Sequence, residues 1–227
     1  MQELEIKFIN HSISGNETRL HVKDEEFNLM GVESQINIYY KNFGVDDLDF
    51  ICESFPSMAS ILEEIKSYSK FSLRTRMTRP DIDIVDTNII IKAANKDVIN
   101  GNDRREITFN IDPDKFDQVD ELLSNRYGVE SKWDRVRRSY FSSNLIMSVD
   151  KNSGYGIIGE IEILDPDLPS NPYNSVEDLV KLIDGTEYEL LSVDRVNEWY
   201  KIYCTMWDRF YKTGKTFKDF EDTKHLL

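Results

Sequence analysis

The stretch Glu3-Leu4-Glu5-Ile6-Lys7-Phe8, near the start of the chain, decides how the other predicted strands are interpreted. Side chains alternate across a β-strand. Glu3, Glu5 and Lys7 therefore share one face of the predicted strand, and the apolar residues between them share the other. One such strand is typical of a sheet with one solvated face, so its meaning depends on whether the pattern recurs.

The alternation does recur, with arginine favoured over lysine on the predicted strands and carboxylates paired two residues apart. Arginine is suited to forked contacts with phosphate oxygens. Paired carboxylates suit hard divalent cations. The later positions that follow the pattern are Arg74 with Arg76, Lys92, Arg104 with Glu106, Arg135 with Arg137, Asp150, and Glu160 with Glu162.

Two arrangements of these strands remain open from the pattern alone. In one, the charged faces contact water and the apolar faces meet in a sandwich. In the other, the charged faces line a shared cavity and the apolar faces meet helices outside. A triphosphate carries roughly four negative charges, and its burial requires partners. The second arrangement supplies cations for the phosphates and carboxylates for Mg²⁺ or Mn²⁺, which would bridge phosphate oxygens.

Hydrophobic periodicity predicts an α+β fold. Eight windows alternate as half-buried strands do, at residues 3–9, 35–40, 71–77, 88–93, 104–111, 134–141, 145–150 and 157–164. Helical spacing predicts helices at residues 57–68, 114–125 and 193–211, with a short one from residue 175 to 182. We expect a closed eight-stranded antiparallel β-barrel with helices packed outside it. The polar segment 10–34 is expected to be a lid or specificity loop.

Length and composition limit the domain organisation and the partners. A chain of 227 residues predicts one domain over residues 1–227, with the C-terminal helices 175–211 packing on the barrel. The formal net charge of -14 argues against a general coat for DNA. No window approaches the ~18 apolar residues of a membrane span, and the N-terminus carries no secretion signal. We therefore expect a cytoplasmic protein without a membrane partner, either monomer or homodimer.

Taken in order along the chain, these motifs resemble the CYTH superfamily, also called the triphosphate tunnel metalloenzymes, which includes class IV adenylyl cyclases and thiamine triphosphatases. Glu3-Leu4-Glu5-Ile6-Lys7 resembles the opening ExExK motif of that family. The resemblance covers residues 1–164. The later stretches that carry it are Leu73-Arg74-Thr75-Arg76, Lys92, Arg104-Arg105-Glu106, Arg135-Val136-Arg137 with Tyr140, and Asp150, Gly154 and Gly156 with Glu160-Ile161-Glu162.

The resemblance implies a triphosphate tunnel that works with Mg²⁺ or Mn²⁺, and it implies a role for each matching residue. The implied metal ligands are Glu3, Glu5, Glu106, Asp150, Glu160 and Glu162. The implied phosphate ligands are Lys7, Arg74, Arg76, Lys92, Arg104, Arg135 and Arg137. The implied catalytic set is Glu3, Glu5, Lys7, Glu160 and Glu162.

Three positions bear on how closely the chain follows the family pattern. Thr108 stands where many members carry a further acidic residue, which would weaken a second metal. Arg104 is preferred over its neighbour Arg105 because it shares strand parity with Glu106. For the same reason, Arg137 is preferred over Arg138 as the partner of Arg135.

Three functions follow from the motifs. The first is a metal-dependent triphosphatase acting on inorganic tripolyphosphate, thiamine triphosphate, a nucleotide or an RNA 5′ end. The second is an adenylyl cyclase that converts ATP to cyclic AMP and pyrophosphate, which would need an adenine pocket. The third is a non-catalytic sensor that binds polyphosphate or a nucleotide.

Overall fold

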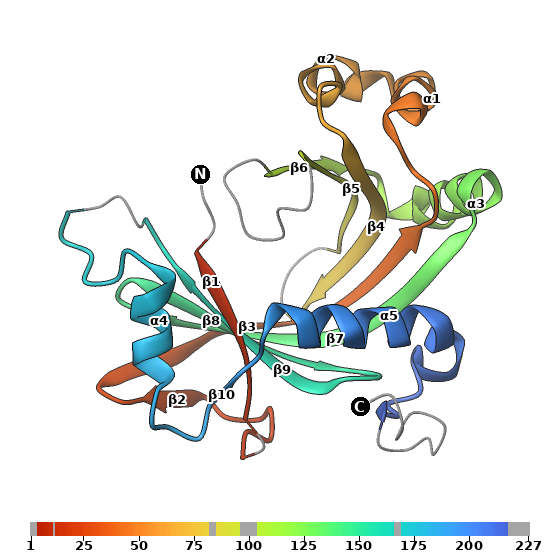
Figure 1. Ribbon diagram of the computed structural model, residues 1–227. Coiled ribbons are helices and arrows are strands. Elements are labelled where there is room, and N and C mark those ends of the chain that lie inside the picture. Colours follow the sequence, from red (N-terminus) through yellow and green to blue (C-terminus); the bar gives the residue numbers. More distant parts are fainter. Residues whose placement is uncertain (1–3, 11, 82–84, 96–103, 166–168, 218–227) are drawn as a thin grey trace. The chain divides into compact units, whose positions relative to one another are not determined.

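The computed structural model describes residues 4–10, 12–81, 85–95, 104–165 and 169–217. The fold is α+β, a mostly antiparallel sheet with a few helices (Figure 1). Its contacts divide the chain into two compact units. Unit 1 comprises Met1–Gln35, Pro80–Asp83 and Trp133–Leu227, and unit 2 comprises Ile36–Arg79 and Ile84–Lys132. The long strands β3 (Glu25–Tyr40) and β7 (Val129–Ser142) contribute residues to both units.

Unit 1 has the strand order β10-β1-β9-β8-β7-β3, and β2 pairs with β3. Its other strands are β1 (Glu5–Ile9), β2 (Arg19–Val22), β8 (Leu145–Asn152), β9 (Gly156–Ile163) and β10 (Glu189–Leu190). Its helices are α4 (Val176–Ile183) and α5 (Val193–Phe210). Each helix begins after a serine whose hydroxyl caps a backbone amide. Ser175 accepts from the amide of Asp178, and Ser192 accepts from the amide of Arg195.

One face of the unit 1 sheet is apolar and carries its main core. Ile6 and Phe8 of β1 lie in this core with Ile161 of β9, and α4 and the β2–β3 hairpin add further large side chains to it. The pairing of β1 with β9 places Phe8 opposite Gly159. A Cβ at Gly159 would lie 2.0 Å from Cζ of Phe8. Glycine at this position therefore lets the aromatic ring lie flat against the neighbouring strand.

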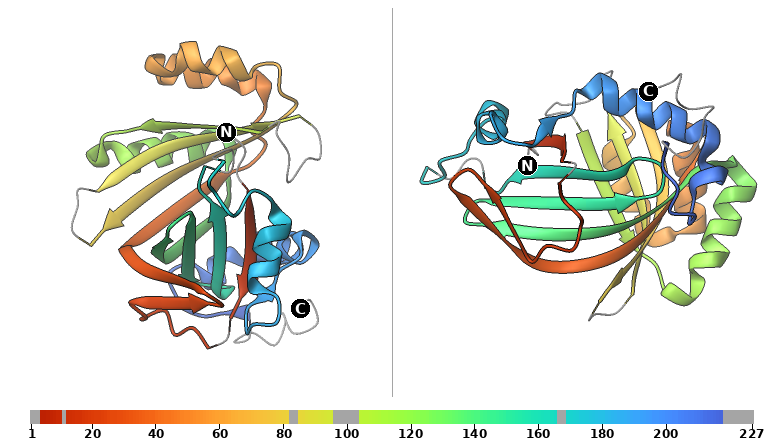
Figure 2. Two further views of the ribbon diagram at one scale, coloured as in Figure 1. Left: turned by 90° about the vertical axis from the view of Figure 1, so that its left-hand side faces the viewer. Right: turned by 90° about the horizontal axis from the view of Figure 1, so that it is seen from below.

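Helix α5 packs on the other face of the same sheet. Its residues Trp199 and Tyr203 form an aromatic core with Ile9 of β1 and Ile158 of β9. Ile9 and Ile158 have the same strand parity as Lys7 and Glu160. In Figure 2, α5 (blue) and the β2–β3 hairpin (red to orange) lie on opposite sides of the unit 1 strands. The aromatic residues of α5 therefore lie on the face that carries Lys7 and Glu160, and the core around α4 lies on the opposite face.

Unit 2 has the strand order β7-β3-β4-β5-β6, with helices against one face of the sheet. Leu73, Ile89 and Ile91 of this face are fully buried against helical residues such as Leu62 and Leu123. The remaining strands are β4 (Lys70–Pro80), β5 (Asp86–Ala94) and β6 (Arg104–Asn110), and the helices are α1 (Leu48–Ser54), α2 (Ala59–Leu62) and α3 (Phe116–Tyr127). Short 3₁₀ turns at Val45–Asp47, Pro56–Met58, Glu63–Ile65 and Pro113–Lys115 adjoin these helices.

The predicted strands all overlap observed strands, but two predicted segments differ from expectation. The expected lid or specificity loop, residues 10–34, contains β2 and the first part of β3. The single helix expected at residues 57–68 is a series of short helical turns, and α1 precedes it. Pro56 separates α1 from these turns because proline disfavours helical conformation in the preceding residue, and Phe55 is non-helical. Closure of the sheet into an eight-stranded barrel stays a prediction.

None of the helices in the described part of the chain is both long and apolar enough to cross a membrane.

Candidate triphosphate and metal site

In unit 1, strand register brings the predicted charged residues onto one face of the sheet. Glu5 lies opposite Glu162, and Lys7 lies opposite Glu160, across the β1–β9 pair. On β8, Ser148 lies opposite Glu160, so Asp150, two residues further along, has the same parity. Across the β7–β8 pair, Arg137 of β7 lies opposite Asp150, and Arg135 lies opposite Asn152. We call Glu5, Lys7, Arg135, Arg137, Asp150 and Glu160 the unit 1 charged cluster.

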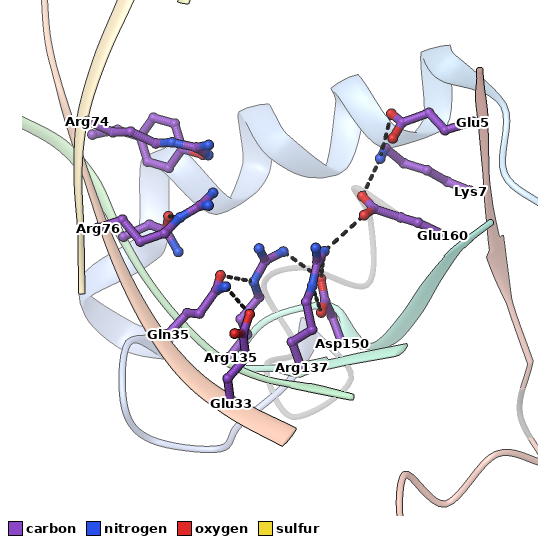
Figure 3. Close-up of polar contacts among 12 residues, drawn as sticks. Glu5, Lys7, Glu33, Gln35, Arg74, Arg76, Arg135, Arg137, Asp150 and Glu160 are labelled. Carbon is purple, nitrogen blue, oxygen red and sulfur yellow. Dashed lines mark hydrogen bonds and ion pairs between the residues drawn. The ribbon is translucent and has the colours of Figure 1, made fainter. Parts of the chain in front are cut away.

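Lys7 is held between two carboxylates of this cluster (Figure 3). Its Nζ lies 3.2 Å from Oε1 of Glu5 and donates a hydrogen bond to Glu160. Burial alone would lower the pKa of Lys7, but the charges of Glu160 and Glu5 outweigh it and raise this pKa above its ordinary value. Lys7 is therefore a permanent cation near neutral pH.

Two arginines from β7 converge on Asp150, whose side chain is only 7% exposed. Arg137 makes a forked contact, with Nε 2.7 Å from Oδ1 and Nη2 2.8 Å from Oδ2. Its Nη2 also donates to Glu160 at 2.9 Å. Arg135 contacts Asp150 through Nη1 at 2.5 Å. This geometry gives two fixed guanidinium groups on the same sheet face as Lys7.

The charges of the cluster reinforce each other's ionisation. Burial alone would raise the pKa of Glu160, but Lys7 and Arg137 hold it to about 2. Burial alone would lower the pKa of Arg137, but its hydrogen bonds and ion pairs with Asp150 and Glu160 raise it. Glu160 is consequently an anion, and Arg137 a cation, throughout the physiological pH range.

Gln35 and Glu33 of β3 join the unit 1 cluster, although the sequence analysis did not select them. Oε1 of Gln35 accepts from Nε of Arg135 at 2.8 Å, and the Gln35 amide donates to Glu33 (Figure 3). Gln35 is 5% exposed. A buried amide orients the guanidinium without cancelling its charge.

Unit 2 carries a second cationic group on one face of its sheet. Lys92 lies opposite both Ser72 of β4 and Glu106 of β6, which places all three side chains on one face with Arg74. Nζ of Lys92 contacts Oε2 of Glu106 at 2.5 Å, and Nη2 of Arg74 lies 3.7 Å from Oε1. Burial alone would raise the pKa of Glu106, but Lys92, Arg74 and Arg76 lower it.

The arginines of unit 2 are also oriented by neutral groups from β3. Nη1 of Arg74 donates to the Tyr39 hydroxyl at 2.7 Å, and Nε of Arg76 donates to Oδ1 of Asn37 at 2.9 Å. Asn37 is buried. Nε of Arg74 is buried and makes no hydrogen bond among the described residues.

Three further sequence-selected positions are Glu3, Arg104 and Glu162. Glu3 lies outside the described residues, and so does the side chain of Arg104, whose backbone pairs with Ala94. Glu162 lies opposite Glu5 in register. Arg105 and Arg138 lie opposite Ala93 and Val149, on the faces away from Glu106 and Arg137, which agrees with the parity argument for their neighbours.

Two carboxylates of the unit 1 charged cluster, Glu5 and Glu160, lie close enough together to share one cationic partner, Lys7. Among the residues that the structure describes, no three acidic, histidine or cysteine side chains are grouped so as to hold a metal. Mg²⁺ is commonly bound by one or two carboxylates together with substrate phosphates. Glu5 and Glu160, which both contact Lys7, supply that kind of donor set.

Comparison with known proteins gives information on the fold. No family model and no curated protein matches the chain. Among solved structures, the PH1819 protein of Pyrococcus horikoshii OT3 is 23% identical with a TM-score of 0.51, covering 86% of this chain and 97% of that one. The PH1012 protein of the same organism is 17% identical (TM-score 0.48, 80% and 90% covered).

A third similar structure comes from Vibrio parahaemolyticus and is named "putative adenylate cyclase". It is 18% identical with a TM-score of 0.48, covering 87% of this chain and 98% of that one. The similarity to PH1819 shows a related fold and carries no statement about activity. The two TM-scores below 0.5 carry no further conclusion.

Proposed function

We propose that this chain binds a triphosphate and hydrolyses it with the help of Mg²⁺ or Mn²⁺, as a member of the CYTH superfamily. The observation that carries the proposal is the unit 1 charged cluster. Three cations, Lys7, Arg135 and Arg137, lie on one sheet face with three carboxylates, and all are half-buried or buried. Buried ion pairs contribute little net stability. Fold stability alone therefore does not account for so many half-buried charges on one face of the sheet.

The ionisation states support the roles that we propose for these residues. Lys7 keeps its proton because its pKa is raised, so it acts as a phosphate ligand and not as a general base. Glu160 has a pKa of about 2, so it acts as an anionic ligand and not as a general acid. Arg135 and Arg137 present forked donors that match phosphate oxygens. In unit 2, Arg74, Arg76 and Lys92 are proposed as further phosphate ligands, and Glu106 as their counter-ion.

Glu5, Glu160 and Glu162, with Glu3 and Asp150, would hold the divalent cation, which supplies charge neutralisation on the phosphate oxygens. In the hydrolysis, water forms a bond to the terminal phosphorus, the bridging P–O bond breaks, and diphosphate (or ADP from ATP) leaves. The protons of the water stay on the phosphate products or pass to solvent. The arginines and Lys7 stabilise the charge that develops on the leaving oxygens. The closed eight-stranded tunnel that the resemblance implies stays part of this proposal.

The decisive experiment measures product formation with Mn²⁺ or Mg²⁺, using inorganic tripolyphosphate and ATP as substrates. The expected products are phosphate with diphosphate or ADP. Cyclic AMP with pyrophosphate would instead identify a cyclase, and tight binding without turnover would identify a sensor.

Glu5→Gln is the variant that tests the role of the carboxylates. It should abolish turnover while the fold survives, because Glu5 contacts Lys7 at the sheet face and has no part in the core. Glu26→Gln is the matched control, since Glu26 is an exposed strand carboxylate that contacts Arg19. Unchanged turnover in Glu5→Gln would contradict the proposed metal role.

A further inference from the structure

A chain of hydrogen bonds in unit 1 runs from the half-buried carboxylate of Glu33 to the guanidinium of Arg135 (Figure 3). The side-chain amide of Gln35 lies between the two. It donates through Nε2 to Oε1 of Glu33, and its Oε1 accepts from Nε of Arg135 at 2.8 Å. Glu33 and Gln35 are two residues apart on β3, so they share one face of the strand. The chain therefore connects a carboxylate to a proposed phosphate ligand through one buried amide.

The chemistry of its two partners allows the Gln35 amide only one orientation. An ionised carboxylate can only accept hydrogen bonds, and a guanidinium can only donate them. If the amide were turned over, its NH₂ group would face the donor of Arg135 and its oxygen would face the acceptor of Glu33. Both contacts would then be repulsive. Glu33 therefore keeps Oε1 of Gln35 directed at Arg135.

Gln35 and Asp150 together fix the plane of the Arg135 guanidinium. Oδ2 of Asp150 accepts from Nη1 at 2.5 Å, and Gln35 accepts from Nε. Two acceptors at different donors of a planar group define its plane, whereas one acceptor alone lets the group turn about that contact. A guanidinium makes paired contacts with phosphate oxygens through donors in one plane. The orientation of Arg135 thus depends on an amide whose own orientation depends on Glu33.

The charge of Glu33 does not by itself favour phosphate binding. Its carboxylate makes no ion pair among the described residues, so no cation there offsets its charge. A negative charge beside a phosphate ligand repels an anionic substrate. The hydrogen bond with Gln35 is therefore the contact through which Glu33 can favour binding of a triphosphate.

We propose that Glu33 is a positioning residue, which acts through Gln35 to hold Arg135 in the orientation that binds a phosphate. This inference rests on the proposed function and deepens it. It gives a role in substrate binding to a carboxylate that contacts neither the phosphates nor the metal. The role depends on the length of the side chain and not on its charge.

Glu33→Asp tests this role because it keeps the charge but makes the side chain one methylene too short to reach Gln35. Calorimetry with Mn²⁺ should show tripolyphosphate affinity falling by about three- to tenfold, the range for one hydrogen bond. The KM should rise by a similar factor while kcat stays within about twofold. Glu33→Gln should bind at least as tightly as the wild type, since its amide oxygen can still accept from Gln35 and the charge is gone. Glu26→Asp, at an exposed carboxylate of the same strand, is the matched control.

Repeating Glu33→Asp in a Gln35→Ala protein separates an effect through Gln35 from a direct one. Without the amide, the substitution should change affinity by less than about twofold. Arg135→Lys is the second background if Gln35→Ala does not fold, because a lysine ammonium has no plane to orient. Wild-type affinity in Glu33→Asp, or an equal loss in both backgrounds, would overturn this inference and leave the proposed function standing. A wild type that does not bind tripolyphosphate would overturn both.

Discussion

At the scale of single residues, the organising feature of unit 1 is Glu160, which contacts both Lys7 and Arg137. Its pKa of about 2 lies below its ordinary value of 4.5. A carboxylate with a depressed pKa contributes stability that is present above its unfolded pKa and is lost as the pH falls through the folded one. The unfolded chain binds the proton first, so acid weakens this part of the fold.

We therefore expect the free energy of unfolding of the wild type to fall between pH 5.5 and pH 2.5 by roughly 1–3 kcal/mol more than that of Glu160→Gln. Urea unfolding at the two pH values measures the difference. Glu26→Gln should follow the wild type, since its parent carboxylate is exposed. Parallel pH profiles for the wild type and Glu160→Gln would show that Glu160 is not the group stabilised by Lys7 and Arg137.

At the scale of elements, β3 contributes a polar face that the sequence analysis did not assign. Gln35, Asn37 and Tyr39 alternate on this strand, and each accepts a hydrogen bond from an arginine. The strand itself was predicted from residue 35 to 40. Neutral side chains do not stand out among charged pairs in a sequence, although the spacing of two residues between Gln35, Asn37 and Tyr39 is a signal that they share one face.

The amide of Gln35 should matter because it is neutral. Gln35→Glu keeps the size and the acceptor oxygen but adds a negative charge beside Arg135. We expect tripolyphosphate affinity to fall about tenfold, since a buried carboxylate there would neutralise the guanidinium and repel the phosphates. Calorimetry measures the affinity, and thermal unfolding checks that stability is retained. A Gln35→Glu protein that binds as tightly as the wild type would assign Gln35 a packing role only.

For the helices, the sequence predicts where a helix lies in the chain but not which face of the sheet it covers. The spacing of aromatic residues predicted the helix at 193–211, and α5 spans Val193–Phe210. The same spacing could not tell which face of the sheet it covers. That choice depends on Ile9 and Ile158, apolar residues that continue the charged face of β1 and β9. Similarly, β2 and the start of β3 were not predicted, because segment 10–34 is mostly polar. Its buried strand residues, Leu20, Val22 and Phe27, are too few to give a clear alternating pattern.

At the scale of the whole molecule, two compact units each have a core and a charged sheet face of their own. The chain as a whole has a formal net charge of -14, so a triphosphate approaches it against a repulsive field. The cations of the unit 1 charged cluster and a divalent metal must together overcome this repulsion. The proposed function therefore requires that phosphate binding depend strongly on the metal.

Thermal unfolding in the presence of tripolyphosphate tests that requirement on the intact chain. A ligand at about 100 times its dissociation constant stabilises the folded state by about 2.7 kcal/mol, which for a chain of this size corresponds to a rise in Tm of about 5–11 °C. We expect that rise with Mn²⁺ present, and only a small part of it when EDTA removes the metal. In Glu5→Gln, which loses a proposed metal ligand, the shifts with and without Mn²⁺ should be nearly equal. A wild-type shift unaffected by EDTA would mean that the arginines and Lys7 hold the phosphates without a cation, and would contradict the metal-dependent mechanism.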